Sequence, residues 1–275
     1  MIEINGKPVI PEFFPAGEQR LRFAVTPDTQ YSVTWRYERE EELITLFYLA
    51  KHIRGQGGEL AMLYVPYLPN ARMDRVKSGE EVFTLKYFCE FVNSLGFGKI
   101  VINNPHSDVC MALLNNAEDG YFSSEKRQHN NALIDALMKR LNLDSGRDVL
   151  FYPDQGCAKK YEGVIRFPFL TGHKKRDWGT GKIQSLDISG VIPPAPFNVL
   201  IVDDICSYGG TFLHAARKLK ELGAGKIWLY VTHCENSLLK GELVQSGLIE
   251  KIYTTRSIFT AEAPEILEIL EERNA

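Results

Sequence analysis

Short apolar runs alternate along the chain with stretches that carry apolar residues at helical spacing. In the first half, residues 59–65 and 99–103 are short runs rich in apolar, β-branched or aromatic residues, which is typical of buried strands. Helical periodicity predicts helices over residues 39–53, 82–95 and 127–141. Strands and helices that alternate in this way predict βαβ units. We therefore expect an α/β fold with a mainly parallel sheet flanked by helices.

The same pattern begins again after a turn-rich segment at residues 142–148. The second half is expected to contain strands at residues 148–152, 198–203 and 226–231, and helices at 209–222 and 264–272. Pro264 suits the first turn of the last helix. The sequence therefore predicts two tandem α/β domains, residues 1–142 and 143–275.

Composition and charge narrow the class of protein. The 275 residues are 44% hydrophobic and 24% charged, as in globular domains, and the net charge of −3 argues against nucleic acid as the main partner. No apolar stretch approaches the length of a membrane span, and the first residues lack the plan of a signal peptide. Five scattered cysteines without a Cys-x-x-Cys motif suit a reducing compartment, so we expect a cytoplasmic protein without structural zinc.

Two polar segments do not show the periodicity of a helix or a strand. Residues 66–81 are basic and rich in turn formers, and residues 171–182 hold four basic residues and three glycines. Long polar loops within a packed protein are commonly functional. We therefore expect both segments to be functional loops rather than regular elements.

The strongest chemical motif is an apolar strand that ends in Asp203 and Asp204 and leads to Gly209-Gly210-Thr211 at the start of a helix. Glycines let the backbone approach an anion, and helix N-terminal amides favour phosphate. The carboxylates can accept hydrogen bonds from sugar hydroxyls or hold Mg²⁺. The motif predicts a phosphorylated-sugar site at the carboxyl end of a parallel strand, although an ordinary strand-to-helix turn with solvated acids is an alternative.

This motif resembles the phosphoribosyl-diphosphate loop of the type I phosphoribosyltransferases and of the ribose-phosphate diphosphokinases (phosphoribosyl diphosphate synthetases). Five further segments resemble the diphosphokinases, in that family's order. They are Phe-Pro-Ala-Gly-Glu at 14–18, Tyr-Leu-Pro-Asn-Ala-Arg-Met-Asp-Arg at 67–75, Asn-Asn-Pro-His at 103–106, Pro-Asp-Gln-Gly-Cys-Ala-Lys-Lys at 153–160 and His-Lys-Lys-Arg at 173–176. Residues 70–93 look most like the short diphosphokinases of large bacteriophages.

The resemblance implies transfer of the diphosphoryl group of ATP to the anomeric hydroxyl of ribose 5-phosphate, with Mg²⁺ as cofactor. It also implies a homo-oligomer, because in this family the 14–18 loop reaches a neighbouring subunit's site. The roles carried over are catalysis by Lys174 and Arg176; ATP binding by Phe14, Ala16, Gly17, Glu18, Arg72, Met73 and Asp74; ribose-phosphate binding by Asp203, Asp204, Ser207, Tyr208, Gly209, Gly210 and Thr211; and metal binding by His106 and Asp154.

The chain departs from the family pattern at several of these positions. Ser207 and Tyr208 stand where the family has Asp and Thr, Asn104 replaces an Asp two residues before His106, and Met73 replaces a Gln. The bulkier Tyr208 can stack on, or open toward, a larger 5′ substituent, so ADP-ribose is an alternative acceptor that would serve NAD salvage instead of nucleotide biosynthesis. Two further alternatives are a phosphoribosyltransferase, which shares only the 203–211 loop, and an inactive regulatory homologue.

Overall fold

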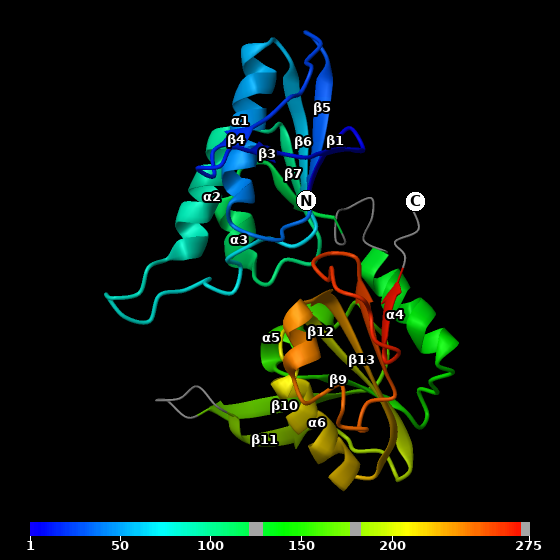
Figure 1. The fold of residues 1–275 in the computed structure, drawn as a ribbon. Coiled ribbons are helices and arrows are strands. Elements are labelled where there is room, and N and C mark those ends of the chain that lie inside the picture. Colours follow the sequence, from blue (N-terminus) through cyan, green and yellow to red (C-terminus); the bar gives the residue numbers. More distant parts are fainter. Residues whose placement is uncertain (121–128, 177–182, 271–275) are drawn as a thin grey trace. The chain divides into compact units, whose positions relative to one another are not determined.

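The computed structural model describes residues 1–120, 129–176 and 183–270, with side chains for 1–120, 132–173 and 186–270. The chain divides into two compact units, Met1–Arg127 and Gln128–Ala275, each built around its own sheet (Figure 1). The α/β class with two mainly parallel sheets flanked by helices is confirmed. In the described part of the chain, every helix is too short or too polar to span a membrane.

The first unit contains a six-stranded sheet in the order β2-β1-β5-β6-β7-β8. Strands β5 to β8 run parallel to one another, and β1 pairs antiparallel with both β2 and β5. A separate hairpin joins β3 and β4. The elements are β1 (Ile2–Ile4), β2 (Lys7–Val9), β3 (Glu12–Phe13), β4 (Gln19–Arg20), β5 (Gln30–Trp35), α1 (Glu42–Gly55), β6 (Glu59–Val65), α2 (Thr84–Leu95), β7 (Lys99–Ile102), α3 (Asp108–Leu113) and β8 (Ala117–Asp119).

Helix α2 shows why the spacing of apolar residues in the first unit predicted a helix correctly. Its buried residues recur every three or four positions and belong to the core that β5, β6 and β7 also line. Phe88 stacks on Trp35 at the end of β5, with ring centroids 6.1 Å apart. The helix ends at Gly96, whose φ of +72° is the left-handed conformation of a glycine cap. The predicted helix at 82–95 is confirmed, with its start two residues later.

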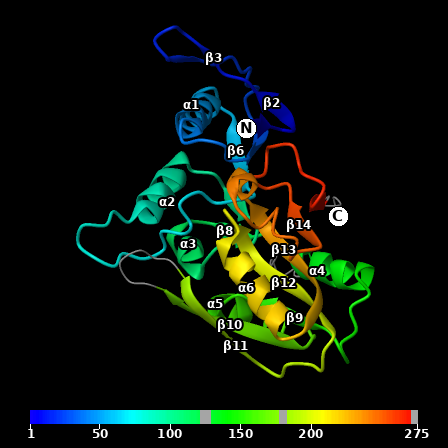
Figure 2. The ribbon, with the colours of Figure 1, turned by 60° about the horizontal axis from the view of Figure 1, so that its bottom comes forward.

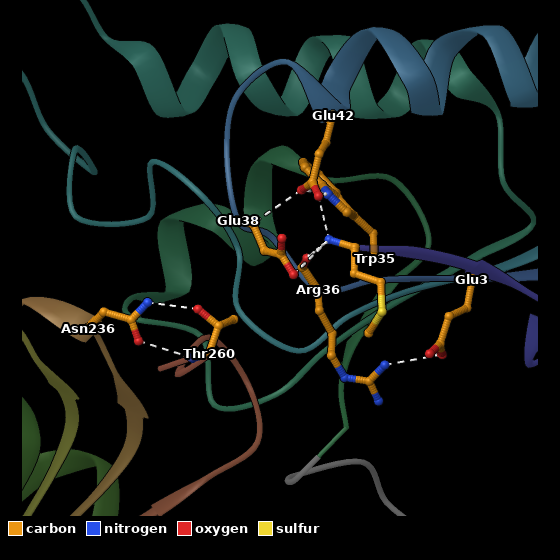
Figure 3. A network of polar contacts seen from close by, with 8 residues as sticks. Glu3, Trp35, Arg36, Glu38, Glu42, Asn236 and Thr260 are labelled. Carbon is orange, nitrogen blue, oxygen red and sulfur yellow. Dashed lines mark hydrogen bonds and ion pairs between the residues drawn. The ribbon is translucent and has the colours of Figure 1, made fainter. Parts of the chain in front are cut away.

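Glu42 connects the sheet of the first unit to helix α1. Its carboxylate accepts hydrogen bonds from Trp35 Nε1 at 2.9 Å and from the backbone N–H of Glu38 at 3.0 Å, and it also pairs with the amino group of Met1 (Figure 3). Arg36 pairs with Glu3 across the adjacent strands at 3.2 Å. These contacts fix the turn between β5 and α1 and are separate from the candidate site.

The second unit contains a seven-stranded sheet in the order β11-β10-β9-β12-β13-β14-β15, parallel except for β11. Helix α6 packs against β13 and β11 (Figure 2). The elements are α4 (His129–Arg140), β9 (Val149–Tyr152), α5 (Gln155–Tyr161), β10 (Phe169–Arg176), β11 (Ile183–Ser189), β12 (Phe197–Cys206), α6 (Gly210–Glu221), β13 (Ala224–Cys234), the 3₁₀ helix η1 (Asn236–Lys240), β14 (Lys251–Thr255) and β15 (Leu267–Leu270).

The predicted helix at residues 264–272 is wrong. Residues 267–270 form strand β15, which pairs in parallel with β14, and residues 271 and 272 lie outside the described part. The open edge of β14 offers backbone groups that a neighbouring strand satisfies. Leu267 is buried, and Ile266 and Ile269 pack against the same core. This tertiary pairing outweighs the helical propensity of the Glu- and Leu-rich segment.

The prediction that residues 171–182 form no regular element is also wrong in part. Residues 171–176 belong to β10, which pairs with β11 as an antiparallel hairpin, with Thr171 opposite Ser189 and Lys174 opposite Leu186. Residues 177–182 lie outside the described part of the chain. Beyond Thr171, β10 no longer pairs with β9, so this part of the strand has an open edge, where charged and polar residues are common. The polarity that suggested a loop therefore suits this part of the hairpin.

Helix α4 belongs to the second compact unit, although its residues fall within the first predicted domain. Arg140 at its end donates two hydrogen bonds to Glu268 of β15, at 2.5 and 2.9 Å. These bonds outweigh partial burial and lower the pKa of Glu268. The predicted domain boundary between residues 142 and 143 stays a prediction.

Asp148, just before β9, gives the second unit a pH-dependent contribution to stability. Its side chain is fully buried and accepts hydrogen bonds from the backbone N–H groups of Asp144 (2.9 Å) and Asn198 (2.8 Å) and from Arg147 (3.3 Å). Burial acts to raise the pKa of Asp148, but these donors together outweigh it, and the net pKa is lowered. The contribution is present above the unfolded-state pKa and is lost as the pH falls through the folded-state pKa.

We expect Asp148→Asn to reduce the free energy of unfolding at neutral pH by about 1–3 kcal/mol, since hydrogen bonds to a buried charge are lost. Urea unfolding of both proteins at several pH values measures this, and the difference should shrink as the pH falls. Asp187→Asn, at an exposed aspartate of β11, is the matched control and should unfold like the wild type. Equal stability of Asp148→Asn and wild type at neutral pH would contradict the assignment.

Candidate active site

The two acids of the sugar motif lie within the last residues of β12. This strand continues to Cys206, three residues beyond its predicted end, with Asp203 opposite Val231 and Cys206 opposite Cys234 of β13. Asp203 Oδ1 accepts the backbone N–H of Asp204 at 2.9 Å. Both acids are half-buried at the carboxyl end of a central parallel strand, where ligands bind in open α/β sheets.

Residues 207–211 form a tight turn from β12 into α6. Gly209 has φ +82°, and a Cβ there would lie 2.8 Å from Leu243, so both the backbone conformation and the space require glycine. A Cβ on Gly210, the first residue of α6, would meet nothing within 4 Å. Thr211 follows and is half-buried. The turn therefore offers open space beside the first amides of a twelve-residue helix, an arrangement that favours anions.

The segment that follows β13 holds this loop in place. The backbone N–H of Glu235 donates to the carbonyl of Cys206 at 2.8 Å. Ser207 Oγ lies 3.0 Å from Ser237 Oγ, and Ser237 donates to Glu235 at 2.9 Å. Tyr208 is 58% exposed. Sequence reasoning missed Glu235 and Ser237, because only the pairing of β12 with β13 brings them beside the loop.

Three carboxylates of the candidate site gather around one buried thiol. Asp154 caps helix α5 by accepting the N–H of Cys157 at 3.0 Å, and Cys157 Sγ donates to the carbonyl of Val202 at 3.1 Å. Burial raises the pKa of Cys157 well above its usual value, and the negative charges of Asp203, Asp204 and Asp154 raise it further. The structure thus brings Asp154 close to the acids of β12, and Cys157 stays protonated between them.

The predicted catalytic residues Lys174 and Arg176 belong by their backbone to β10. Their side chains lie outside the described residues. β10 pairs with β9 only as far as Thr171, opposite Tyr152, and then continues beyond the carboxyl end of β9 (Figure 1). At about 3.3 Å per residue, the backbone of Lys174 lies about 10 Å past that end. This is the edge of the sheet at which Asp154 follows β9.

In the first unit, the segments after β6 and β7 come together. Asn103 donates to the hydroxyl of Tyr64 at 2.5 Å, and its N–H donates to the carbonyl of Pro66 at 3.3 Å. Two hydrogen bonds from Arg75 lower the pKa of Asp74 against the effect of burial, and Ser107 and the charge of His106 lower it further. Asp74 and His106 are therefore neighbours at the carboxyl edge of this sheet.

The remaining predicted ATP residues of the first unit are exposed. Arg72 and Met73 are exposed beside Asp74. Phe14, Ala16, Gly17 and Glu18 form the tip of the β3–β4 hairpin, which is closed by a 2.9 Å hydrogen bond from Phe14 N–H to the carbonyl of Glu18. Gly17 has φ +88°, which this turn requires. About half of the surface of Phe13 and of Phe14 is exposed, so the tip presents aromatic rings to its surroundings.

Asn104 stands where the family has an acid, and its role in this structure is to shape the backbone. It has φ +46°, a left-handed conformation that asparagine tolerates better than most residues. Its N–H donates to Asp119 at 3.0 Å, and the residue is fully buried. The residue therefore shapes the turn that leads to His106.

Within the described ranges, no group of three or more His, Cys, Asp or Glu side chains is arranged to hold a metal ion. Protein sites for Mg²⁺ commonly supply only one or two carboxylates and leave the remaining ligands to substrate phosphates and water. Asp154, at the start of α5 and close to Asp203 and Asp204, can supply one carboxylate to that kind of shared site.

No family model matches the chain, but comparison with known proteins finds relatives that cover most of it. The chain is 28% identical over 229 residues to a ribose-phosphate pyrophosphokinase of Saccharolobus solfataricus. The aligned region covers 81% of this chain and 75% of that protein. It is 25% identical to one of Pyrococcus furiosus, covering 94% and 90%. The fold matches a phosphoribosylpyrophosphate synthetase from Mycobacterium smegmatis with a TM-score of 0.74 and 18% identity, over 96% of this chain and 85% of that one. The chain is thus similar to ribose-phosphate pyrophosphokinases along most of its length.

Proposed function

We propose that this protein transfers the β,γ-diphosphoryl group of ATP to the anomeric hydroxyl of ribose 5-phosphate, giving phosphoribosyl diphosphate and AMP. The observation that carries this proposal is similarity to ribose-phosphate pyrophosphokinases along 94% of the chain. A match over that share of the chain includes the proposed ATP segment at 67–75 and the proposed sugar-phosphate loop at 203–211. A phosphoribosyltransferase would need only the latter.

The second unit supplies the binding groups for the sugar phosphate. Gly209, Gly210 and Thr211 offer backbone amides and a hydroxyl to the 5-phosphate, and the dipole of α6 favours its negative charge. Asp203 and Asp204 accept hydrogen bonds from the ribose hydroxyls. Ser207 and Tyr208 border the same phosphate. Acceptors for the hydroxyls and donors for the phosphate are thus separated along one loop.

The first unit supplies the binding groups for ATP. Arg72 can grip phosphate oxygens with its planar guanidinium, and Met73 and Asp74 lie next to it in the chain. The aromatic tip at Phe14, with Ala16, Gly17 and Glu18, contacts the nucleoside. Because this tip is exposed, we also propose a homo-oligomer in which it completes the ATP site of another copy.

In the reaction, the anomeric oxygen forms a bond to the β-phosphorus, and the bond from that phosphorus to the α,β-bridging oxygen breaks. Such transfers depend on positioning and on positive charge around the transferring group. Lys174 supplies a mobile charge and Arg176 a two-pronged donor. His106 and Asp154 are the residues proposed for Mg²⁺, which would neutralise charge on the phosphates. The five free, buried cysteines suit a reducing compartment, so we place the reaction in the cytoplasm.

The acceptor can be identified directly. We expect AMP to accumulate when the protein is incubated with ATP, Mg²⁺ and ribose 5-phosphate, as measured by chromatography, with a C1 diphosphate product visible by ³¹P NMR. D-ribose is the matched control without a phosphate and should yield little AMP. AMP formed with ADP-ribose but not with ribose 5-phosphate would overturn the acceptor and keep the transfer. AMP formed with neither would overturn the catalytic proposal.

A further inference from the structure

Two serine hydroxyls form a hydrogen-bonded relay that connects the sugar-phosphate loop to a carboxylate in the segment after β13. Ser207 in the loop lies 3.0 Å from the hydroxyl of Ser237, and Ser237 donates to Oε2 of Glu235 at 2.9 Å. All three residues are half-buried. Partial burial strengthens such hydrogen bonds relative to those in open solvent.

The carboxylate of Glu235, at the end of the relay, determines which hydroxyl donates in each hydrogen bond. An ionised glutamate accepts hydrogen bonds and cannot donate, whereas each serine hydroxyl has one hydrogen to give. Ser237 gives its hydrogen to Glu235. The bond between the serines must then use the hydrogen of Ser207. What Ser207 has left for a ligand is lone pairs, so it presents an acceptor in a loop whose backbone amides are donors.

We propose that Glu235 and Ser237 are specificity-determining positioning residues, which act through Ser207 by turning its hydroxyl into a hydrogen-bond acceptor. This inference rests on the proposed function of the loop. A phosphate dianion has only acceptor oxygens, so it gains nothing from Ser207. A 5′ group that carries an O–H or N–H is matched to it. The relay therefore limits the affinity of the loop for the 5-phosphate of ribose 5-phosphate, which the backbone amides and Thr211 hold without a hydrogen bond from Ser207.

Two variants distinguish the proposed relay from an effect of the charge of Glu235 and from an anchoring of the loop by Ser237. Glu235→Ala removes the charge but keeps the bond between the serines, and Ser237→Ala keeps the charge but cuts the relay. In Glu235→Ala, Ser237 no longer donates to a carboxylate and can donate to Ser207 instead, and in Ser237→Ala, Ser207 loses its acceptor. Either change frees the hydrogen of Ser207 for the ligand. We expect both variants to bind ribose 5-phosphate about three- to tenfold more tightly by calorimetry, the range for one hydrogen bond. The KM for ATP should stay unchanged.

Other causes give different results. Charge alone would tighten binding in Glu235→Ala only, and loss of an anchor would weaken binding in Ser237→Ala. Either result would overturn the relay. The gain from Ser237→Ala should also disappear in the Ser207→Ala background, because the effect passes through Ser207. A gain that persists there would overturn the proposal as well.

Asn236, between the two relay residues, provides the matched control. Its side chain contacts Thr260 and Ala261 instead of the loop (Figure 3). Asn236→Ala should lower the melting temperature and leave the Kd for ribose 5-phosphate unchanged, and an equal gain there would overturn the assignment to the relay. Absence of ribose 5-phosphate binding in every protein, wild type included, would overturn the proposed function and the inference with it. Binding by wild type that neither variant changes overturns the inference alone.

Discussion

Gly241→Ala is expected to lower kcat/KM for ribose 5-phosphate by about a hundredfold, although residue 241 lies outside the sugar motif. Gly241 follows helix η1 with φ −88°, a conformation open to any residue. A Cβ there would overlap the carbonyl oxygen of Tyr208 and lie 2.8 Å from its carbonyl carbon. The methyl group must therefore displace the backbone just before Gly209. A shift of about 1 Å in a positioning group can cost about a hundredfold in rate.

Steady-state kinetics with each substrate varied in turn measures this effect, which should be far smaller for the KM of ATP. Gly55→Ala is the control, since a Cβ at this position at the end of α1 meets nothing within 4 Å. Circular dichroism establishes that both variants fold. If Gly241→Ala retains activity within twofold of the wild type, then η1 does not set the position of the loop.

The elements that sequence patterns predicted well are those whose environment is uniform along their length. Residues 59–65 form β6 as predicted, because the six residues after Glu59 are all apolar, as in strands that are largely covered on both faces. The turn at Gly209 and Gly210 was also predictable. Its requirements, a left-handed residue and open backbone before a helix, are local to five residues.

The features that the sequence did not predict depend on partners distant in the chain. β15 is a strand because β14 has an edge to fill, and no local pattern in residues 264–272 indicates that edge. Glu235 and Ser237 lie about thirty positions from Ser207 and become its neighbours only through the register of β12 and β13. Gly241 looks like any turn glycine until the backbone of Tyr208 is placed against it. Pairing between strands therefore supplied the information that periodicity lacks.

Lys174→Ala is expected to lower kcat by a factor of about 10²–10³ with little change in either KM. The transferring diphosphoryl group gains charge on its outer oxygens in the transition state, and loss of one well-placed donor commonly costs this much. The backbone supports the assignment, since β10 carries Lys174 past the carboxyl end of β9, to the same edge of the sheet as Asp154 and Asp203.

Lys175→Ala provides a matched control, because it removes the same charge from the adjacent position of the same strand. We expect it to retain most of the wild-type kcat, as measured by AMP release under saturating substrates. Equal losses in the two variants would indicate that the hairpin contributes a diffuse positive field rather than one specific contact. A kcat for Lys174→Ala within tenfold of the wild type would remove this lysine from the chemical step, and Arg176 would then have to supply the charge.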